Sequence, residues 1–284
     1  MDTGSKKTWD KVITPRNGWF DLHLDELWKY RDLICLFVWR DFVSIYKQTI
    51  LGPLWYIFQP LLTTIVFTFV FGNIAQLPTD GMPPFLFYLS GVILWKYFSD
   101  CLVGTSNTFV NNAHIFGKVY FPRLTVPVSV VISNLIALFV QFVLFLIFYL
   151  YFLINSVLIH PQPAIVLLPI LIIQMAALGL GFGMIVSSLT TRYRDLTHLV
   201  SFGVQLWMFA TPVVYPASSF PDKWLWILSI NPMAPVIETF RYAFLGAGSI
   251  DLQSWLTSIV ITIFVLFAGI MLYSRVEKTF MDTV

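Results

Sequence analysis

The chain has 284 residues, of which 57% are hydrophobic and only 11% are charged. An ordinary soluble domain carries about 25% charged residues, so this composition excludes a soluble globular protein and indicates an integral membrane protein. The formal net charge of +2 says little by itself, because the distribution of charge decides the topology of a membrane protein.

The N-terminal part of the chain is polar and then amphipathic. Residues 1–18 are predicted to form a solvated arm, without the apolar core of a cleavable signal peptide. Residues 19–48 alternate apolar and charged side chains at helical spacing, which predicts a helix lying in the membrane interface. Its predicted apolar stripe consists of Leu27, Tyr30, Ile34, Phe37, Val38, Phe42 and Ile45.

Residues 49–284 are predicted to form one all-α transmembrane domain with six spans. Five segments reach the roughly 20 apolar residues that cross a bilayer, at about 50–72, 85–109, 125–154, 164–189 and 255–274. The remaining segment, 199–217, is barely long enough and contains Pro212 and Pro216. We therefore expect its outer end to unwind, with other parts of the protein covering the freed carbonyl groups.

Two short helices are predicted between the fifth and sixth spans, in the periplasmic region 218–250. Asn231 and Pro232 predict the start of the second helix, and Gly246 predicts its end. A helix of about 14 residues is about 21 Å long, too short to cross the membrane, so both helices are expected to be re-entrant. Glu238 and Arg241 are three residues apart and are predicted to pair at the outer mouth of the protein.

The positive-inside rule supports six spans with both termini in the cytoplasm. This arrangement places most of the 17 Lys and Arg residues on the cytoplasmic side. If residues 231–246 formed a seventh crossing, Arg275 and Lys278 would lie outside the cell, against the rule.

The sequence lacks the residue patterns of an ATP-binding or catalytic site. Its only Gly-Lys pair, Gly117-Lys118, is followed by Val119 and does not fit a phosphate-binding loop. The four His residues are scattered, and neither Cys35 nor Cys101 has metal-ligand spacing, so we expect no metal site. Catalysis by this chain alone is therefore not predicted.

Lys96 and Asp100 form an ionisable pair four residues apart within the second predicted span. Charged residues at membrane depth often mark a transport path or a proton relay. They can equally neutralise each other against a neighbouring helix. Both interpretations remain open.

Aromatic residues are abundant, with 27 Phe, 12 Tyr and 10 Trp. Most fit membrane-interface belts or lipid-facing packing. In the first and fifth spans, however, they occur beside amide and hydroxyl side chains, a combination that suits sugar rings with an apolar face and polar edges. The candidate glycan contacts are Trp55, Tyr56, Gln59, Phe67, Phe71, Trp207, Phe209 and Tyr215.

Several short motifs follow one another along the chain. They are Arg40-Asp41 with Tyr46-Lys47, Leu51 to Trp55 with Pro60, Lys118 to Arg123 with Pro127, and the segments 192–196, 211–216 and 231–233. In this order they resemble the membrane subunits of type-2 ABC exporters that move polysaccharides such as O-antigen, capsule and teichoic-acid precursors. The resemblance runs from about residue 30 to the end of the chain.

The resemblance implies a permease subunit in a bacterial inner membrane. Two copies would form a homodimer, and two copies of a separate ATPase subunit would bind ATP and Mg²⁺, with no cofactor in this chain and no role for nucleic acid. The cargo would be a lipid-linked polysaccharide such as O-antigen, passing near spans one and five.

The resemblance also implies two contacts with the ATPase, through the interface helix and through a coupling helix in the loop 111–123. A turn at Gly52-Pro53 would carry motion from the interface helix to span one. The residues assigned to coupling are Arg40, Asp41, Tyr46, Lys47, His114, Phe116, Lys118, Tyr120 and Arg123.

Two other functions remain open. A type-2 exporter of a small amphiphile or drug would share the fold, although a less polar first span than Gln59, Thr63 and Thr64 provide would be expected. A membrane-embedded glycan-processing enzyme would need a cluster of carboxylates or histidines at one depth, and the sequence does not predict one.

Overall fold

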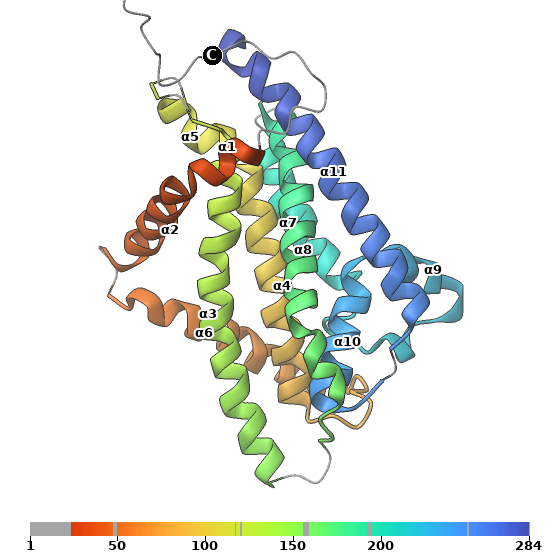
Figure 1. Cartoon of the computed structure of the whole chain (residues 1–284). Coiled ribbons are helices and arrows are strands. Elements are labelled where there is room, and N and C mark those ends of the chain that lie inside the picture. Colours follow the sequence, from red (N-terminus) through yellow and green to blue (C-terminus); the bar gives the residue numbers. More distant parts are fainter. Residues whose placement is uncertain are drawn as a thin grey trace, which may run out of the picture.

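The computed structural model describes residues 24–47, 50–116, 118–119, 121–155, 159–191, 195–248 and 250–283. Within these ranges the chain forms helices and connecting segments and contains no strand (Figure 1). Five helical segments of the described chain are long and apolar enough to cross a membrane: Gly52–Ile74, Pro84–Ser106, Thr125–Asn155, Pro163–Thr190 and Leu252–Val276. They confirm the all-α fold and match the five longer predicted segments.

The amphipathic segment consists of two helices, α1 (Leu24–Lys29) and α2 (Arg31–Tyr46), separated at Tyr30. The described part of its predicted apolar stripe, from Leu27 to Phe42, faces the protein: Phe37 is only 5% exposed, and the other stripe residues in this range are half-buried. Asp32 and Arg40, on the opposite side, are exposed. The helical part is thus two elements where the sequence predicted one, and the predicted arm 1–18 lies outside the described residues.

The first span begins with the tight turn that the sequence predicted. Gly52 has a φ of 50°, a left-handed conformation that glycine adopts without a steric penalty. It starts the 3₁₀ turn η1 (Gly52–Leu54), with Pro53 near the start of the helix, where the N–H group that proline lacks is not needed. The span continues as α3 (Trp55–Phe67) and ends in a π-helix, η2 (Thr68–Ile74), which the sequence did not predict.

The helix α4 (Pro84–Ser106) is the centre of the bundle. It packs against α3, α6 (Thr125–Asn155), α7 (Leu168–Thr190) and α8 (Leu196–Phe209). The 3₁₀ turn η3 (Pro163–Leu167) leads into α7. α7 lies between α4 and α11 (Leu252–Thr283), with Gly179 and Gly183 against α4 and Gly181 against Gly269 of α11. These glycines allow the three backbones to approach closely, as small residues do in membrane helix pairs.

The segment predicted as a span at 199–217 is helical only up to Phe209. Residues 210–215 form turns and bends, so the expected unwinding begins before Pro212 and shortens the apolar helix to 14 residues. In the described chain, five rather than six helices therefore reach the length of a full crossing.

The region after α8 contains short helices, as predicted. They are η4 (Ala217–Ser219), η5 (Asp222–Trp224), α9 (Leu225–Ile230) and α10 (Met233–Leu245). Gly246 ends α10 in the left-handed conformation, with a φ of 76°. α10 begins one residue later than predicted, with Pro232 in the N-cap position, and Asn231 accepts a hydrogen bond of 3.1 Å from the N–H group of Met233.

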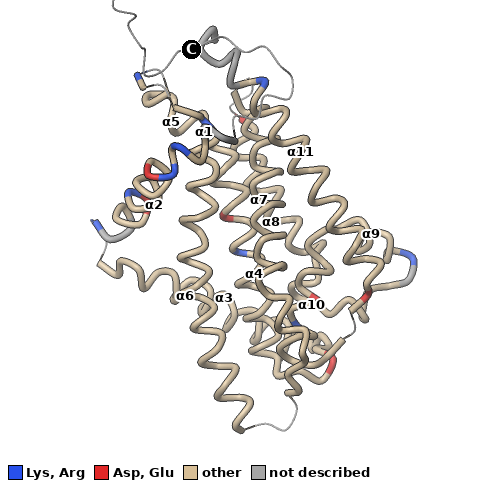
Figure 2. The backbone as a smooth tube through the Cα atoms, viewed as in Figure 1, with Lys and Arg blue, Asp and Glu red and all other residues tan. Residues whose placement is uncertain are grey.

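One end of the molecule gathers α1, α5 (Thr108–Phe116) and the C-terminal end of α11 (Figure 1). Several Lys and Arg residues lie at this end, on α1, α2 and the loop after α5 (Figure 2). Both observations support a shared cytoplasmic side for these elements, and the sidedness itself stays a prediction.

The close packing of α7 predicts different outcomes for Gly183→Ala and Gly203→Ala. A methyl group at Gly183 would lie 2.8 Å from Cγ2 of Thr105 and 2.9 Å from the carbonyl oxygen of Leu102. We expect overpacking to cost about 1–3 kcal/mol and to lower the melting temperature of the purified protein. No atom lies within 4 Å of a methyl group at Gly203, so that variant should unfold at or above the wild-type temperature. Equal melting temperatures for the two variants would contradict the close approach.

Candidate functional site

Arg241 of α10 connects three elements at the interrupted end of α8. Its side chain is 1% exposed, and its guanidinium donates hydrogen bonds to the carbonyl oxygens of Pro212 at 2.6 Å and Val213 at 2.7 Å. A further hydrogen bond of 3.2 Å reaches the carbonyl oxygen of Phe87 in α4, and the guanidinium carbon lies 3.6 Å from the centroid of the Phe87 ring. The planar guanidinium has enough donors to pair several backbone carbonyls at once.

Asn231 satisfies further groups of the same segment from the start of α10. Its amide nitrogen donates hydrogen bonds to Oγ1 of Thr211 at 2.8 Å and to the carbonyl oxygen of Ala210 at 3.2 Å. Sequence analysis identified Asn231 only as a cap and did not identify its contact with α8. The sequence offered one signal for this contact: a polar residue at the start of a helix that follows a span interrupted by prolines, whose freed carbonyl groups need donors.

The predicted pair of Glu238 and Arg241 forms, with 3.7 Å between Oε1 and Nη1. Glu238 also accepts a hydrogen bond of 3.4 Å from the N–H group of Ala217. Arg241 points into the protein core, whereas Glu238 lines a cavity of about 410 Å³ that has both polar and apolar side chains in its wall. The assignment of the pair to an outer mouth stays a prediction.

Other carboxylates in this cavity are hydrogen-bonded to neighbours in the chain. Asp80 accepts hydrogen bonds of 2.8 Å and 3.0 Å from the hydroxyl group of Ser218. The hydroxyl group of Ser254 and the N–H group of Gln253 hold the pKa of Asp251 below its usual value. No group of three or more His, Cys, Asp or Glu residues in the described ranges is placed to hold a metal ion.

The candidate glycan contacts of span one divide into exposed and packed side chains. Trp55 is 49% exposed and Gln59 is exposed, while Tyr56 is half-buried. Phe67 and Phe71 pack against Tyr88 of α4, with ring centroids 6.4 Å and 6.5 Å away. Within one chain, Trp55 and Gln59 are therefore available to a ligand, and the two phenylalanines attach span one to α4.

The candidates near α8 divide in the same way. The ring of Trp207 packs edge-on against Phe98 at 5.3 Å and Phe182 at 5.2 Å between centroids. Tyr215 donates a hydrogen bond of 3.1 Å to the carbonyl oxygen of Phe209, whose own side chain is 47% exposed. Phe209 thus stays open on this segment, and Trp207 has a packing role that its sequence position did not indicate.

Five aromatic residues connect the elements assigned to coupling. The ring centroid of Phe121, in the loop after α5, lies 5.8 Å from that of Phe37 in α2 and 5.7 Å from that of Phe116 in α5. Within α5, the centroids of Phe116 and Phe109 are 5.9 Å apart, and Phe109 stacks on Tyr273 of α11 at 4.7 Å. The contacts therefore run without a break from α2 to α11, through Phe37, Phe121, Phe116, Phe109 and Tyr273. We call this set the aromatic cluster.

The charged coupling candidates surround the aromatic cluster. Arg40 pairs with Asp41 at 2.8 Å and lies 4.8 Å from the ring centroid of Phe37. Arg123 lies 5.5 Å from the ring centroid of Phe116. Phe116 itself is 5% exposed, so its ring packs inside the chain and leaves the surface to its neighbours.

The remaining coupling candidates differ in exposure. Lys47, His114 and Lys118 are exposed. Tyr120 and the side chain of Tyr46 lie outside the described residues. The assigned role of the whole set in ATPase contact stays a prediction.

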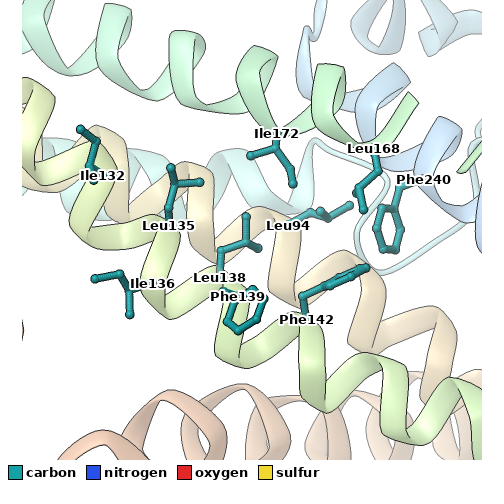
Figure 3. Close-up of a pocket in the computed structure, with 10 residues that line it drawn as sticks. All are labelled: Leu94, Ile132, Leu135, Ile136, Leu138, Phe139, Phe142, Leu168, Ile172 and Phe240. Carbon is teal, nitrogen blue, oxygen red and sulfur yellow. The ribbon is translucent and has the colours of Figure 1, made fainter. Parts of the chain in front are cut away.

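A second cavity, of about 470 Å³, lies between α4, α6, α7 and α10 (Figure 3). All its lining side chains are apolar, including Leu94, Phe139 and Phe240. It therefore offers no side-chain hydrogen bonds that could orient the hydroxyl groups of a sugar.

The five long apolar helices of the described chain define a multi-pass membrane protein. Residues 32–245 match the family model of ABC-2 type transporters, and the chain belongs to this family, the transmembrane part of ATP-driven transporters. The family resemblance drawn from the motifs is confirmed.

Its relatives include O-antigen export system permease proteins. The chain is 26% identical over 255 residues to such a protein, RfbA from Klebsiella pneumoniae, covering 88% of this chain and 94% of that protein. It is also 26% identical over 263 residues to RfbA from Myxococcus xanthus, covering 91% of this chain and 98% of that protein.

The contacts of Arg241 predict that Arg241→Met loosens the segment 210–216. The variant leaves the buried carbonyl groups of Pro212 and Val213 without a donor, and breaking a buried charged network costs about 3–5 kcal/mol. We expect faster amide hydrogen exchange in this segment of the purified protein. Glu238→Gln, a change at a side chain that is 21% exposed, should have a smaller effect. Wild-type exchange in Arg241→Met would show that the anchor is not needed.

Proposed function

We propose that this chain is the permease subunit of an ATP-driven exporter that moves a lipid-linked polysaccharide, most simply an O-antigen, across the bacterial inner membrane. Two copies of the chain form the path, and two copies of a separate ATPase subunit bind ATP and Mg²⁺ on the cytoplasmic side. The similarity to O-antigen export permeases over nearly their whole length supports this cargo.

The observation that carries the proposal is the exposed face of span one. Only 11% of its most apolar window is buried in the single chain, the lowest share among the five candidate spans. Trp55 and Gln59 lie exposed near its start, beside the exposed ring of Phe58. In a complex, this face lines a path between two copies and presents aromatic and amide groups to sugar rings.

The aromatic cluster supports a mechanism for coupling. It fixes α2, α5 and the end of α11 to one another, so a movement of the ATPase against α5 also moves α2. From α2 the movement reaches span one through the turn at Gly52. The chain's own residues thus transmit the motion, and the energy comes from ATP bound to the partner.

Export of a small amphiphile is the second candidate function. The apolar cavity of about 470 Å³ lies in the size range of pockets for drug-sized ligands, which gives this alternative a specific basis. Stimulation of ATPase activity by small amphiphiles, without loss of surface polysaccharide on gene deletion, would favour it over glycan export.

The proposed path predicts that Trp55→Ala lowers surface polysaccharide by about two- to tenfold, the effect of losing an aromatic contact of about 0.5–1.5 kcal/mol. The measurement is polysaccharide on the surface of cells that express each variant at equal membrane levels. Phe264→Ala, which removes a 69% exposed ring from α11, is the matched control and should export normally. Normal export by Trp55→Ala would remove this residue from the path.

The proposed coupling predicts that Phe121→Ala reduces the amount of polysaccharide exported for each ATP hydrolysed. The change removes the ring between α2 and α5, so ATP hydrolysis by the assembled complex should continue while export falls. Phe121→Leu keeps most of the apolar volume and should restore much of the export.

Phe85→Ala is the control for a general packing defect, because Phe85 packs against Phe148 with 4.7 Å between ring centroids, away from the aromatic cluster. It should leave the ratio of export to hydrolysis unchanged. An equal fall in that ratio for Phe121→Ala and Phe85→Ala would contradict coupling through the cluster.

A further inference from the structure

The central helix α4 has one opening in an otherwise buried stretch. From Leu86 to Leu102 every residue is buried except Lys96, Ser99 and Asp100. These three residues are spaced at i, i+3 and i+4 and therefore share one face of the helix. We call them the polar window.

Neighbouring helices cover the other faces of α4. α7 packs against Leu102 and Thr105, and α6 packs against Gly104. α8 packs against Trp95 through the ring of Trp207, with 6.0 Å between centroids. At 3.6 residues per turn, the polar window lies opposite α7, between the sides that face α8 and α6.

The ring contacts of span one with α4 are nearer the outer end of that helix. Phe67 and Phe71 pack against Tyr88, which precedes Lys96 by about 12 Å along the helix axis. The polar window thus lies towards the cytoplasmic end of α4, beyond this contact. It is also on a different face from Leu94, which lines the apolar cavity.

The chemistry of the polar window is the reverse of a lipid-facing surface. On α6 the strongly exposed positions are apolar, for example Phe139 at 67% and Ile147 at 59%. Between Leu86 and Leu102 of α4, by contrast, the partly exposed positions are a lysine, a serine and an aspartate. Charged residues in a membrane face water, protein or one another, because hydrocarbon cannot solvate them.

The charged pair leaves hydrogen-bonding capacity towards the opening. Nζ of Lys96 lies 2.9 Å from Oδ2 and 3.2 Å from Oδ1 of Asp100. The side chains remain 24% and 38% exposed, so ammonium donors and carboxylate lone pairs are accessible beside the hydroxyl group of Ser99. The pair has no net charge, so it offers donors and acceptors to hydroxyl groups without attracting ions of one sign.

We propose that the polar window is a wall of the water-filled translocation path and contacts the hydroxyl groups of the glycan. This adds α4 to the path assigned to spans one and five. The identity of the cargo rests on the proposed function, whereas the exposure of the window to water does not.

Cysteine labelling tests the exposure to water. In the complex with its ATPase, in membranes, Ser99→Cys is placed in a Cys35→Ser background and treated with a charged, membrane-impermeant thiol reagent from either side. The background protein, whose remaining Cys101 is fully buried, should stay unlabelled. Phe139→Cys, at the edge of the apolar cavity on α6, should also stay unlabelled because a charged reagent does not enter an apolar environment, and Val119→Cys, 60% exposed in the loop after α5, should react.

Labelling of Ser99→Cys at a rate well above that of Phe139→Cys supports the proposal. Two results overturn it: labelling as slow as that of Phe139→Cys, or efficient disulfide formation between the two copies at Ser99→Cys without labelling. The second result would place the polar window in a dry contact between copies.

Charge variants then test the contact with cargo. Asp100→Asn leaves a lysine without its counter-charge in the path and should reduce surface polysaccharide at least severalfold. The exchange variant Lys96→Asp with Asp100→Lys keeps the pair and should restore export. Equal export by Asp100→Asn and wild type would overturn the cargo contact. If Ser99→Cys is labelled but deletion of the gene leaves surface polysaccharide unchanged, the polar window lines a water-filled path and the cargo is not the glycan.

Discussion

The packing of α8, α10 and α4 depends on one requirement, the pairing of backbone carbonyl groups where α8 is interrupted. An apolar helix that stops at Phe209 leaves carbonyl groups without partners in a region that provides little water. Arg241 and Asn231, both at α10, supply the missing donors. α10 therefore supplies hydrogen-bond donors that the segment after α8 requires.

This requirement also explains a buried arginine in a membrane protein. Burying a guanidinium is costly unless its donors are paired, and here backbone oxygens, the ring of Phe87 and the carboxylate of Glu238 surround it. A lysine could not replace it fully, because its ammonium lacks the planar arrangement that reaches Pro212 and Val213 together.

Features set by a few neighbouring residues could be predicted from the sequence. The end of α10 at Gly246, the pairs Glu238–Arg241 and Lys96–Asp100, and the five long apolar segments all follow from helical geometry and hydrophobic length. Contacts between distant residues could not, since periodicity identifies a buried face without identifying its partner. The packing of Trp207, the aromatic cluster and the carbonyl partners of Arg241, some 150 residues apart in the case of Phe87, belong to this second group.

The glycine residues of α7 distinguish a closely packed part of the molecule from a less closely packed part. With Gly179 and Gly183 against α4 and Gly181 against Gly269, the backbones of these three helices approach so closely that a methyl group at these positions would overlap a neighbouring helix. These three helices form the most closely packed part of the bundle. Span one, with its π-helical end, is by contrast the least buried of the five long apolar segments, so it is the long helix that the rest of the described chain constrains least.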